Sequence, residues 1–99
     1  GNDNRSITGV GFQPDLVVIR AQTSRYSCWR SSAMSGDVSY SFVDTSTASN
    51  VIQAFEADGF QIGSHLEVNA NGEVYHWIAF RDNGAGAFKV GSYVGNGNE

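Results

Sequence analysis

The first clear β-strand is the stretch Asp15-Leu16-Val17-Val18-Ile19-Arg20-Ala21, which directly follows Pro14. Branched apolar residues dominate the stretch, and side chains alternate along a strand, so Val17, Ile19 and Ala21 share one face. Proline is tolerated at the first residue of a strand, because no central hydrogen bond of the sheet is lost there. The stretch therefore predicts a strand with one apolar face turned toward a core.

A second strand is predicted for Glu73–Phe80, which reads EVYHWIAF. One face of this strand would carry Val74, His76, Ile78 and Phe80, and the other Tyr75, Trp77 and Ala79. Because both faces are largely apolar, we expect the strand to lie in the middle of a sheet and to be covered on both sides. Asn71-Gly72 suits a tight turn, which predicts that Leu66-Glu67-Val68 is the preceding hairpin arm.

The rest of the chain alternates short apolar runs with Gly, Asn, Ser and Asp, as strands joined by turns do. Asp58-Gly59 predicts a hairpin between Ile52–Glu56 and Phe60–Ile62. Ser49–Ala57 offers a helical alternative, but an isolated helix that short is marginal. Further short strands are expected at Ser6–Thr8, Ser27–Arg30, Ser39–Val43 and Phe88–Val94. The predicted fold is an all-β, jelly-roll-like antiparallel sandwich of about eight strands.

Size and charge narrow the class of protein. The 99 residues suit one domain, so residues 1–99 are expected to form a single sandwich. Six Lys and Arg against ten Asp and Glu give a net charge of −4, which opposes nucleic-acid binding. No apolar run has the length of a membrane span, so no membrane insertion is expected. Cys28 is expected to be a buried small hydrophobe, and a single cysteine leaves the compartment open.

No reactive centre is predicted. A nucleophilic site needs a hydroxyl or thiol, a histidine and an acid that converge, but His65 and His76 have no nucleophile elbow beside them. His76 alternates with apolar residues, as a core or sheet-face histidine does, and His65 is expected near a hairpin arm. Asp82-Asn83-Gly84 suits a turn, although its oxygens could instead bind Ca²⁺. Gly9-x-Gly11 precedes a strand and indicates a bend rather than a phosphate loop. We expect no enzyme activity, no cofactor and no metal.

Four residues are candidates for ligand binding. Tyr26, Trp29 and Arg30 lie in a stretch that interleaves aromatic and cationic side chains, and Trp77 lies in the second strand. Exposed aromatic rings stack on sugars, so these four residues predict a carbohydrate-binding face. The alternative is that Trp29 and Trp77 are core aromatics of a small sandwich.

Four segments resemble an uncharacterised β-rich domain family of bacteriophage virion and tail-associated proteins and related bacterial extracellular proteins. They are GVGFQPDLVVI (residues 9–19), WRSS (29–32), IQAFEADGFQIG (52–63) and VNANGEVYHW (68–77). The resemblance spans nearly the whole chain and implies tandem copies, in which a Gly-Asn-rich linker leads into the next unit. Gly97-Asn98-Glu99 nearly repeats Gly1-Asn2-Asp3, which agrees with an array, and the first residue, Gly1, suggests a processed or excised piece.

The expected function is that of a non-enzymatic structural or adhesive module in an extracellular or virion assembly. Its partners would be copies of itself, neighbouring domains of the same assembly, or surface glycans. The residues expected to carry assembly are Ser92, Tyr93, Val94, Gly95 and Asn96. They could complete a sheet in their own domain or in a neighbouring one by strand addition.

Overall fold

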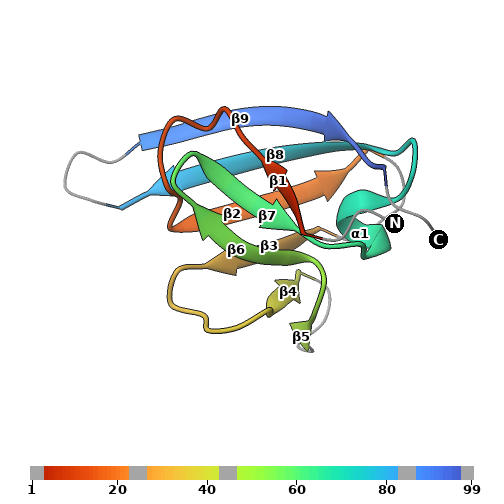
Figure 1. Cartoon of the computed structure of the whole chain (residues 1–99), viewed down its shortest axis with the longest axis horizontal. Helices are drawn as coiled ribbons and strands as arrows, with labels where there is room; N and C mark the ends of the chain where they lie inside the picture. Colours follow the sequence, from red (N-terminus) through yellow and green to blue (C-terminus); the bar gives the residue numbers. More distant parts are fainter. Residues whose placement is uncertain (1–3, 23–26, 43–46, 83–86, 97–99) are drawn as a thin grey trace.

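The computed structural model describes residues 4–22, 27–42, 47–82 and 87–96, which contain nine β-strands and one short helix (Figure 1). The strands are β1 (Arg5–Ile7), β2 (Leu16–Ala21), β3 (Cys28–Ser31), β4 (Ser39–Ser41), β5 (Thr47–Ala48), β6 (Ile52–Glu56), β7 (Gly59–Ile62), β8 (Val74–Arg81) and β9 (Ala87–Val94), and the helix is α1 (Leu66–Asn69). Within these ranges, no helix is long and apolar enough to cross a membrane.

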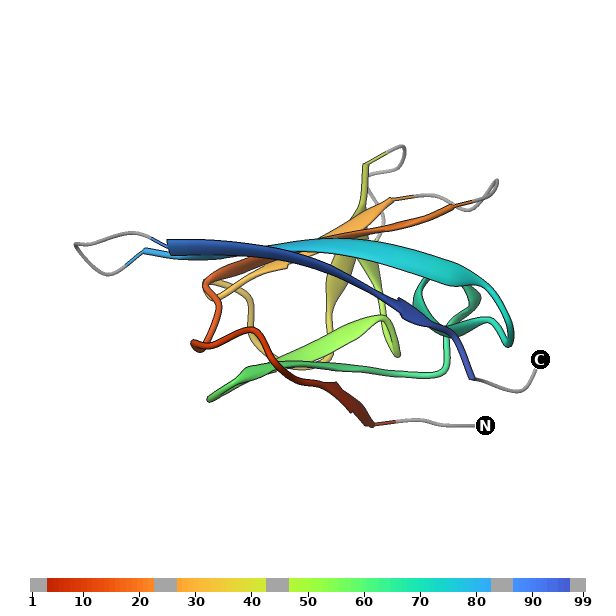
Figure 2. The same cartoon turned by 90° about the horizontal axis from the view of Figure 1, so that it is seen from above.

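The strands form two antiparallel sheets that lie in two layers (Figure 2). The small sheet has the order β1-β7-β6, and the large sheet has the order β5-β4-β3-β2-β8-β9. Strands β2 to β5 are neighbours in sequence and in space, so this part of the large sheet is a simple meander. The arrangement confirms the predicted all-β sandwich.

Strand β2 is the centre of the large sheet, as its composition predicts. It pairs with β3 on one side and with β8 on the other. Val17, Ile19 and Ala21 are buried, whereas Arg20 between them is exposed. The alternation observed is therefore the alternation predicted, with the apolar face of β2 turned toward the small sheet.

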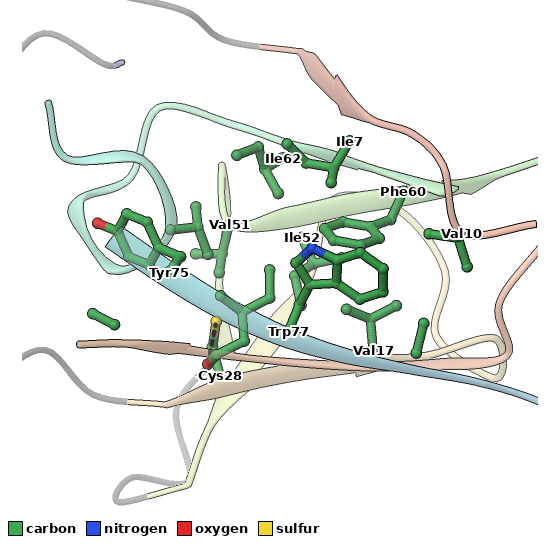
Figure 3. Packing of buried hydrophobic residues seen from close by; sticks show 14 of the residues in the cluster. Ile7, Val10, Val17, Cys28, Val51, Ile52, Phe60, Ile62, Tyr75 and Trp77 are labelled. Atoms are coloured by element: carbon green, nitrogen blue, oxygen red, sulfur yellow. Dashed lines mark hydrogen bonds between the residues drawn. The ribbon is translucent and has the colours of Figure 1, made fainter. Parts of the chain in front are cut away.

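The core fills the space between the two sheets (Figure 3). Trp77 of β8 meets Phe60 of β7 edge-on, with ring centroids 5.5 Å apart. Two large side chains, one from each layer, thus hold the sheets in contact. The buried cluster consists of Ile7, Val10, Phe12, Val17, Ile19, Ala21, Cys28, Val51, Ile52, Phe60, Ile62, Val68, Ala70, Tyr75, Trp77 and Ala79.

The hairpin between β6 and β7 is confirmed. Glu56 faces Gly59 in the register, and the helical alternative for Ser49–Ala57 is wrong over β6. A side chain at Gly59 would collide with the carbonyl oxygen of Ile7 on β1. The small sheet therefore requires glycine at this position.

The hairpin predicted between Leu66-Glu67-Val68 and Glu73–Phe80 is wrong. Leu66–Asn69 is the helix α1, in which the ring Nδ1 of His65 accepts a hydrogen bond from the Glu67 N–H. Val68 and Asn69 are consecutive and both fully buried, which one face of a strand cannot provide. His65 is therefore a helix cap rather than part of a hairpin arm.

Strand β8 lies mid-sheet between β2 and β9, as predicted, but it is not covered on both sides. Tyr75, Trp77 and Ala79 are buried against the small sheet, whereas His76, Ile78 and Phe80 are exposed. In the part of the chain that the structure describes, one small sheet covers one side of the large sheet, so the other apolar face is left open.

Candidate interaction surface

The surface of interest is the side of the large sheet that faces away from the small sheet, which we call the outer face. No other described element lies over it along β8 and β9 (Figure 2). Two apolar rows cross the strands on this face. The pairing register gives the first row as Tyr40, Trp29, Val18, Ile78 and Val90, and the second as Leu16, Phe80 and Phe88.

The outer face carries the exposed apolar surface of the described chain. The large apolar side chains with at least two fifths of their surface exposed are Phe88 (68%), Phe42 (60%), Val90 (58%), Val94 (52%), Ile78 (40%) and Phe80 (40%). Phe42 packs against Trp29 from the end of β4, and the others alternate outward on β8 and β9. Val94 lies beyond the polar row of Arg20, His76 and Ser92, and the other five expose on the order of 500 Å². That area lies in the upper part of the range for the largest apolar patch of a soluble monomer, where such patches are commonly functional.

Aromatic rings gather at two places on the outer face. Trp29 stacks on Tyr40 at a centroid distance of 5.3 Å and contacts Phe42 at 6.3 Å. Phe80 and Phe88 lie 6.3 Å apart on the neighbouring strands β8 and β9. Since both groups are supported by paired strands, the rings are held on a rigid surface.

The two ends of the outer face differ in charge. At one end Arg20 faces His76 in the register, and the His76 Nε2 lies 3.1 Å from the side-chain oxygen of Gln22. At the other end Asp82 follows β8, and its N–H donates to the Asp15 carboxylate at 2.8 Å. The apolar rows therefore lie between the positive charge of Arg20 and the negative charges of Asp15 and Asp82.

The residues predicted to bind a sugar do not form one site. Tyr26 lies outside the described residues. Trp29 is half-buried on the outer face, Arg30 is on the opposite face, and Trp77 is 5% exposed. The prediction that Trp77 offers a stacking surface is wrong, and the alternative of a core aromatic is correct for it, because its position on β8 alternates inward against Phe60.

Arg30 is a buried structural cation. It is 7% exposed, and its guanidinium donates to the carbonyl oxygens of Gly36 (2.6 Å), Val38 (2.7 Å) and Met34 (3.3 Å). Desolvation lowers the pKa of Arg30, and the nearby negative charge of Asp37 partly opposes this. Arg30 thus holds the loop between β3 and β4, and its position on the inner face makes it unavailable to a surface ligand.

The segment predicted to carry assembly completes the domain's own sheet. Ser92, Tyr93 and Val94 pair with β8. The Gly95 N–H donates to the carbonyl of Glu73, and the Asn96 N–H donates to the Asn69 side chain. Of the two possibilities predicted for Ser92–Asn96, the structure shows pairing within the domain. In the described chain β9 is also an edge of the large sheet.

A polar cluster behind β9 fixes this segment. Arg5 donates to the Val94 carbonyl and to the Asn69 side chain, and its guanidinium lies 5.3 Å from the Tyr93 ring centroid. The Tyr93 hydroxyl donates to the Val68 carbonyl at 2.7 Å. Burial, the largest cause, raises the pKa of Tyr93 well above its ordinary value. The cluster therefore joins β1, α1 and β9.

Three acids, Asp58, Asp37 and Asp15, accept hydrogen bonds from backbone N–H groups. Asp58 accepts from Gly9 and Gly11, Asp37 accepts from Asn50, and Asp15 accepts from Asp82. In the described ranges no three metal-ligating side chains cluster. Asn83 and Gly84 of the possible calcium turn lie outside those ranges.

Sequence reasoning missed the outer face as a surface. Both faces of the Glu73–Phe80 strand were expected to be covered, so Ile78 and Phe80 were placed in a core. One available signal was the run Phe88-Lys89-Val90, in which two apolar residues alternate with a charged one. The small size of the domain was a second signal, since few residues remain to cover both faces of a large sheet.

Comparison with known proteins identifies a family for the chain but assigns it no activity. No curated protein and no solved structure matches it. The model of a domain of unknown function, DUF7483, matches residues 1–88, a range that includes β1 to β8. Because the match covers most of the chain, this protein belongs to the DUF7483 family.

Proposed function

We propose that the domain is a non-enzymatic structural or adhesive module of an extracellular or virion assembly, and that it attaches to other proteins of the assembly through the outer face. The observation that carries the proposal is the open apolar face of the large sheet, on which Phe88, Val90 and Ile78 are exposed. Exposed patches of this extent mark interaction sites. The extracellular or virion setting rests on the sequence resemblance.

The construction of the outer face supports this role. Strands β2, β8 and β9 are paired along their lengths, and β8 is held by neighbours on both sides. Their inward side chains are packed in the core, so the outward ones are presented in fixed positions. A preformed surface loses little conformational entropy when it binds.

The test uses the full-length protein that carries the domain, produced in its own host. Particles or cell-surface fractions are separated on density gradients, and incorporation is measured for the wild type and for Phe88→Ser/Val90→Thr. We expect incorporation of the variant to fall at least about tenfold, because the buried apolar contact area is lost. Ser6→Thr, at an exposed position of β1 in the small sheet, is the matched control. A wild type that never enters an assembly, or a variant that enters as well as the wild type, would refute the proposal.

A carbohydrate-binding module is the second candidate, and the stacked Trp29–Tyr40 pair with Phe42 favours it. Flat aromatic groups on a sheet stack on sugar rings. A glycan array probed with the wild type and with Trp29→Ala tests it, with folding checked by circular dichroism. Loss of a specific glycan signal in Trp29→Ala, but not in Phe88→Ser, supports this function, and absence of binding across the array refutes it.

A further inference from the structure

We propose that the outer face binds the outer face of a second copy of this chain, with the strands of the two copies antiparallel, and this inference rests on the proposed function. The two large sheets would stack face to face about a twofold axis that runs across the strands. This axis lies between the row of Ile78 and the row of Phe80.

The first argument is area. Phe88, Phe42, Val90, Ile78 and Phe80 supply on the order of 500 Å², and the half-buried Leu16, Val18, Trp29 and Tyr40 add to it. A stable interface buries about 800 Å² on each partner. The outer face therefore approaches the area that a dimer needs.

The second argument is charge. Arg20 and His76 lie at one end of the apolar rows, and Asp15 and Asp82 lie at the other. From the Arg20 row to Asp82 is about 20 Å along the strand. A twofold axis across the strands reverses their direction, so it brings Arg20 of each copy to Asp82 of the other. An axis along the strands would instead oppose Arg20 to Arg20.

The third argument is side-chain size. With the axis between the two apolar rows, each row packs on the other row of the second copy. Phe80 then meets Ile78, Phe88 meets Val90, and Trp29 meets Ser31, since these residues occupy the same strands one row apart. A large side chain thus meets a smaller one at each strand, as interdigitated sheet faces require. The same surface patch is used by both copies, as a closed dimer demands.

The experiment is sedimentation equilibrium of the 99-residue chain over a wide concentration range. We expect a reversible dimer whose dissociation constant rises at least about tenfold in Phe88→Ser/Val90→Thr and about fivefold in Arg20→Asp or Asp82→Arg alone. Arg20 and the Asp82 side chain lie on the surface, so both single variants are expected to fold. Ser6→Thr, at an exposed position of β1 in the small sheet, is the control and is expected to dimerise as the wild type does.

The geometry is tested by mixing Arg20→Asp with Asp82→Arg. In an antiparallel pair every reversed charge then meets an opposite charge, so the mixture is expected to recover the wild-type dimer. If the mixture stays as weak as the separate variants, the antiparallel arrangement is refuted. If the wild type stays monomeric while incorporation into an assembly still depends on Phe88 and Val90, a different protein occupies the face; this inference then fails and the proposed function stands.

Discussion

At the scale of single residues, the structure explains why particular side chains are excluded. Gly91 of β9 lies opposite Trp77 in the register, and a Cβ at this position would enter the indole ring. Trp77 is held in place by Phe60 on its other side, so it has no room to move away. Because Gly91 has no side chain, the Trp77 ring can lie against β9 and pack on Phe60 of the small sheet.

Gly91→Ala is expected to destabilise the domain by about 1–3 kcal/mol, because an inserted methyl group strains a packed core. Urea unfolding followed by tryptophan fluorescence measures the change. Ser92→Ala, at the next and exposed position of the same strand, should change the free energy of unfolding by less than about 0.5 kcal/mol. Equal stability of Gly91→Ala and the wild type would show that the Trp77 ring is not fixed as described.

At the scale of elements, short strands are held by side chains from distant loops. Asp58 lies in the turn between β6 and β7, and its carboxylate accepts hydrogen bonds from Gly9 (3.1 Å) and Gly11 (2.7 Å). Both glycines have positive φ angles, 88° and 92°, which other residues rarely adopt. The bend between β1 and β2 thus follows from two glycines, and the acid fixes it to the small sheet.

Asp58→Ala is expected to cost about 1–2 kcal/mol of stability, because two backbone N–H groups lose a charged acceptor. The loss of protection against hydrogen exchange should be confined to the bend between β1 and β2. Amide hydrogen exchange at Gly9 and Gly11 should accelerate, while exchange in β2 and β8 stays slow. Glu56→Ala, an acid at the end of β6 in the same hairpin, is the comparison, and an equal exchange pattern in the two variants would contradict the assigned role of Asp58.

At the scale of the whole molecule, two buried ionisable groups link unfolding to alkaline pH. Burial, the larger cause, and the charge of Glu67 raise the pKa of the Cys28 thiol above its ordinary value of 9.0. Burial likewise raises the pKa of Tyr93 above its ordinary value of 10.0. Both groups are neutral in the folded protein, whereas in the unfolded chain they ionise at their ordinary pKa values. Above those pKa values the folded protein therefore binds more protons than the unfolded chain.

The free energy of unfolding is therefore expected to be independent of these groups below about pH 8.5 and to fall as pH rises above 9. Each group contributes a slope of about 1.4 kcal/mol per pH unit once its unfolded form is ionised. Urea titrations between pH 7 and 11 measure the slope. In Cys28→Ala the fall should begin about one pH unit later, near the ordinary pKa of Tyr93, and an unchanged onset would contradict the contribution of the thiol.

The sequence by itself determined the class of the fold. Local pattern is enough for this, because alternation in Asp15–Ala21 and Glu73–Phe80 and the turn residues at Asp58-Gly59 act over a few neighbours. It was misleading at Leu66–Asn69, where a histidine cap and the burial of two consecutive residues made a helix. The burial of Val68 and Asn69 depends on the surrounding core, which a local pattern does not contain.

Only the tertiary structure decided which apolar face of the large sheet is covered. Val17 and Val18 are alike in sequence, yet one is buried and the other lies on the outer face. The difference arises because the small sheet can pack on one side only, and its position depends on contacts between strands far apart in the chain. The candidate surface is what remains on the uncovered side, so its full extent follows from the packing of the two sheets.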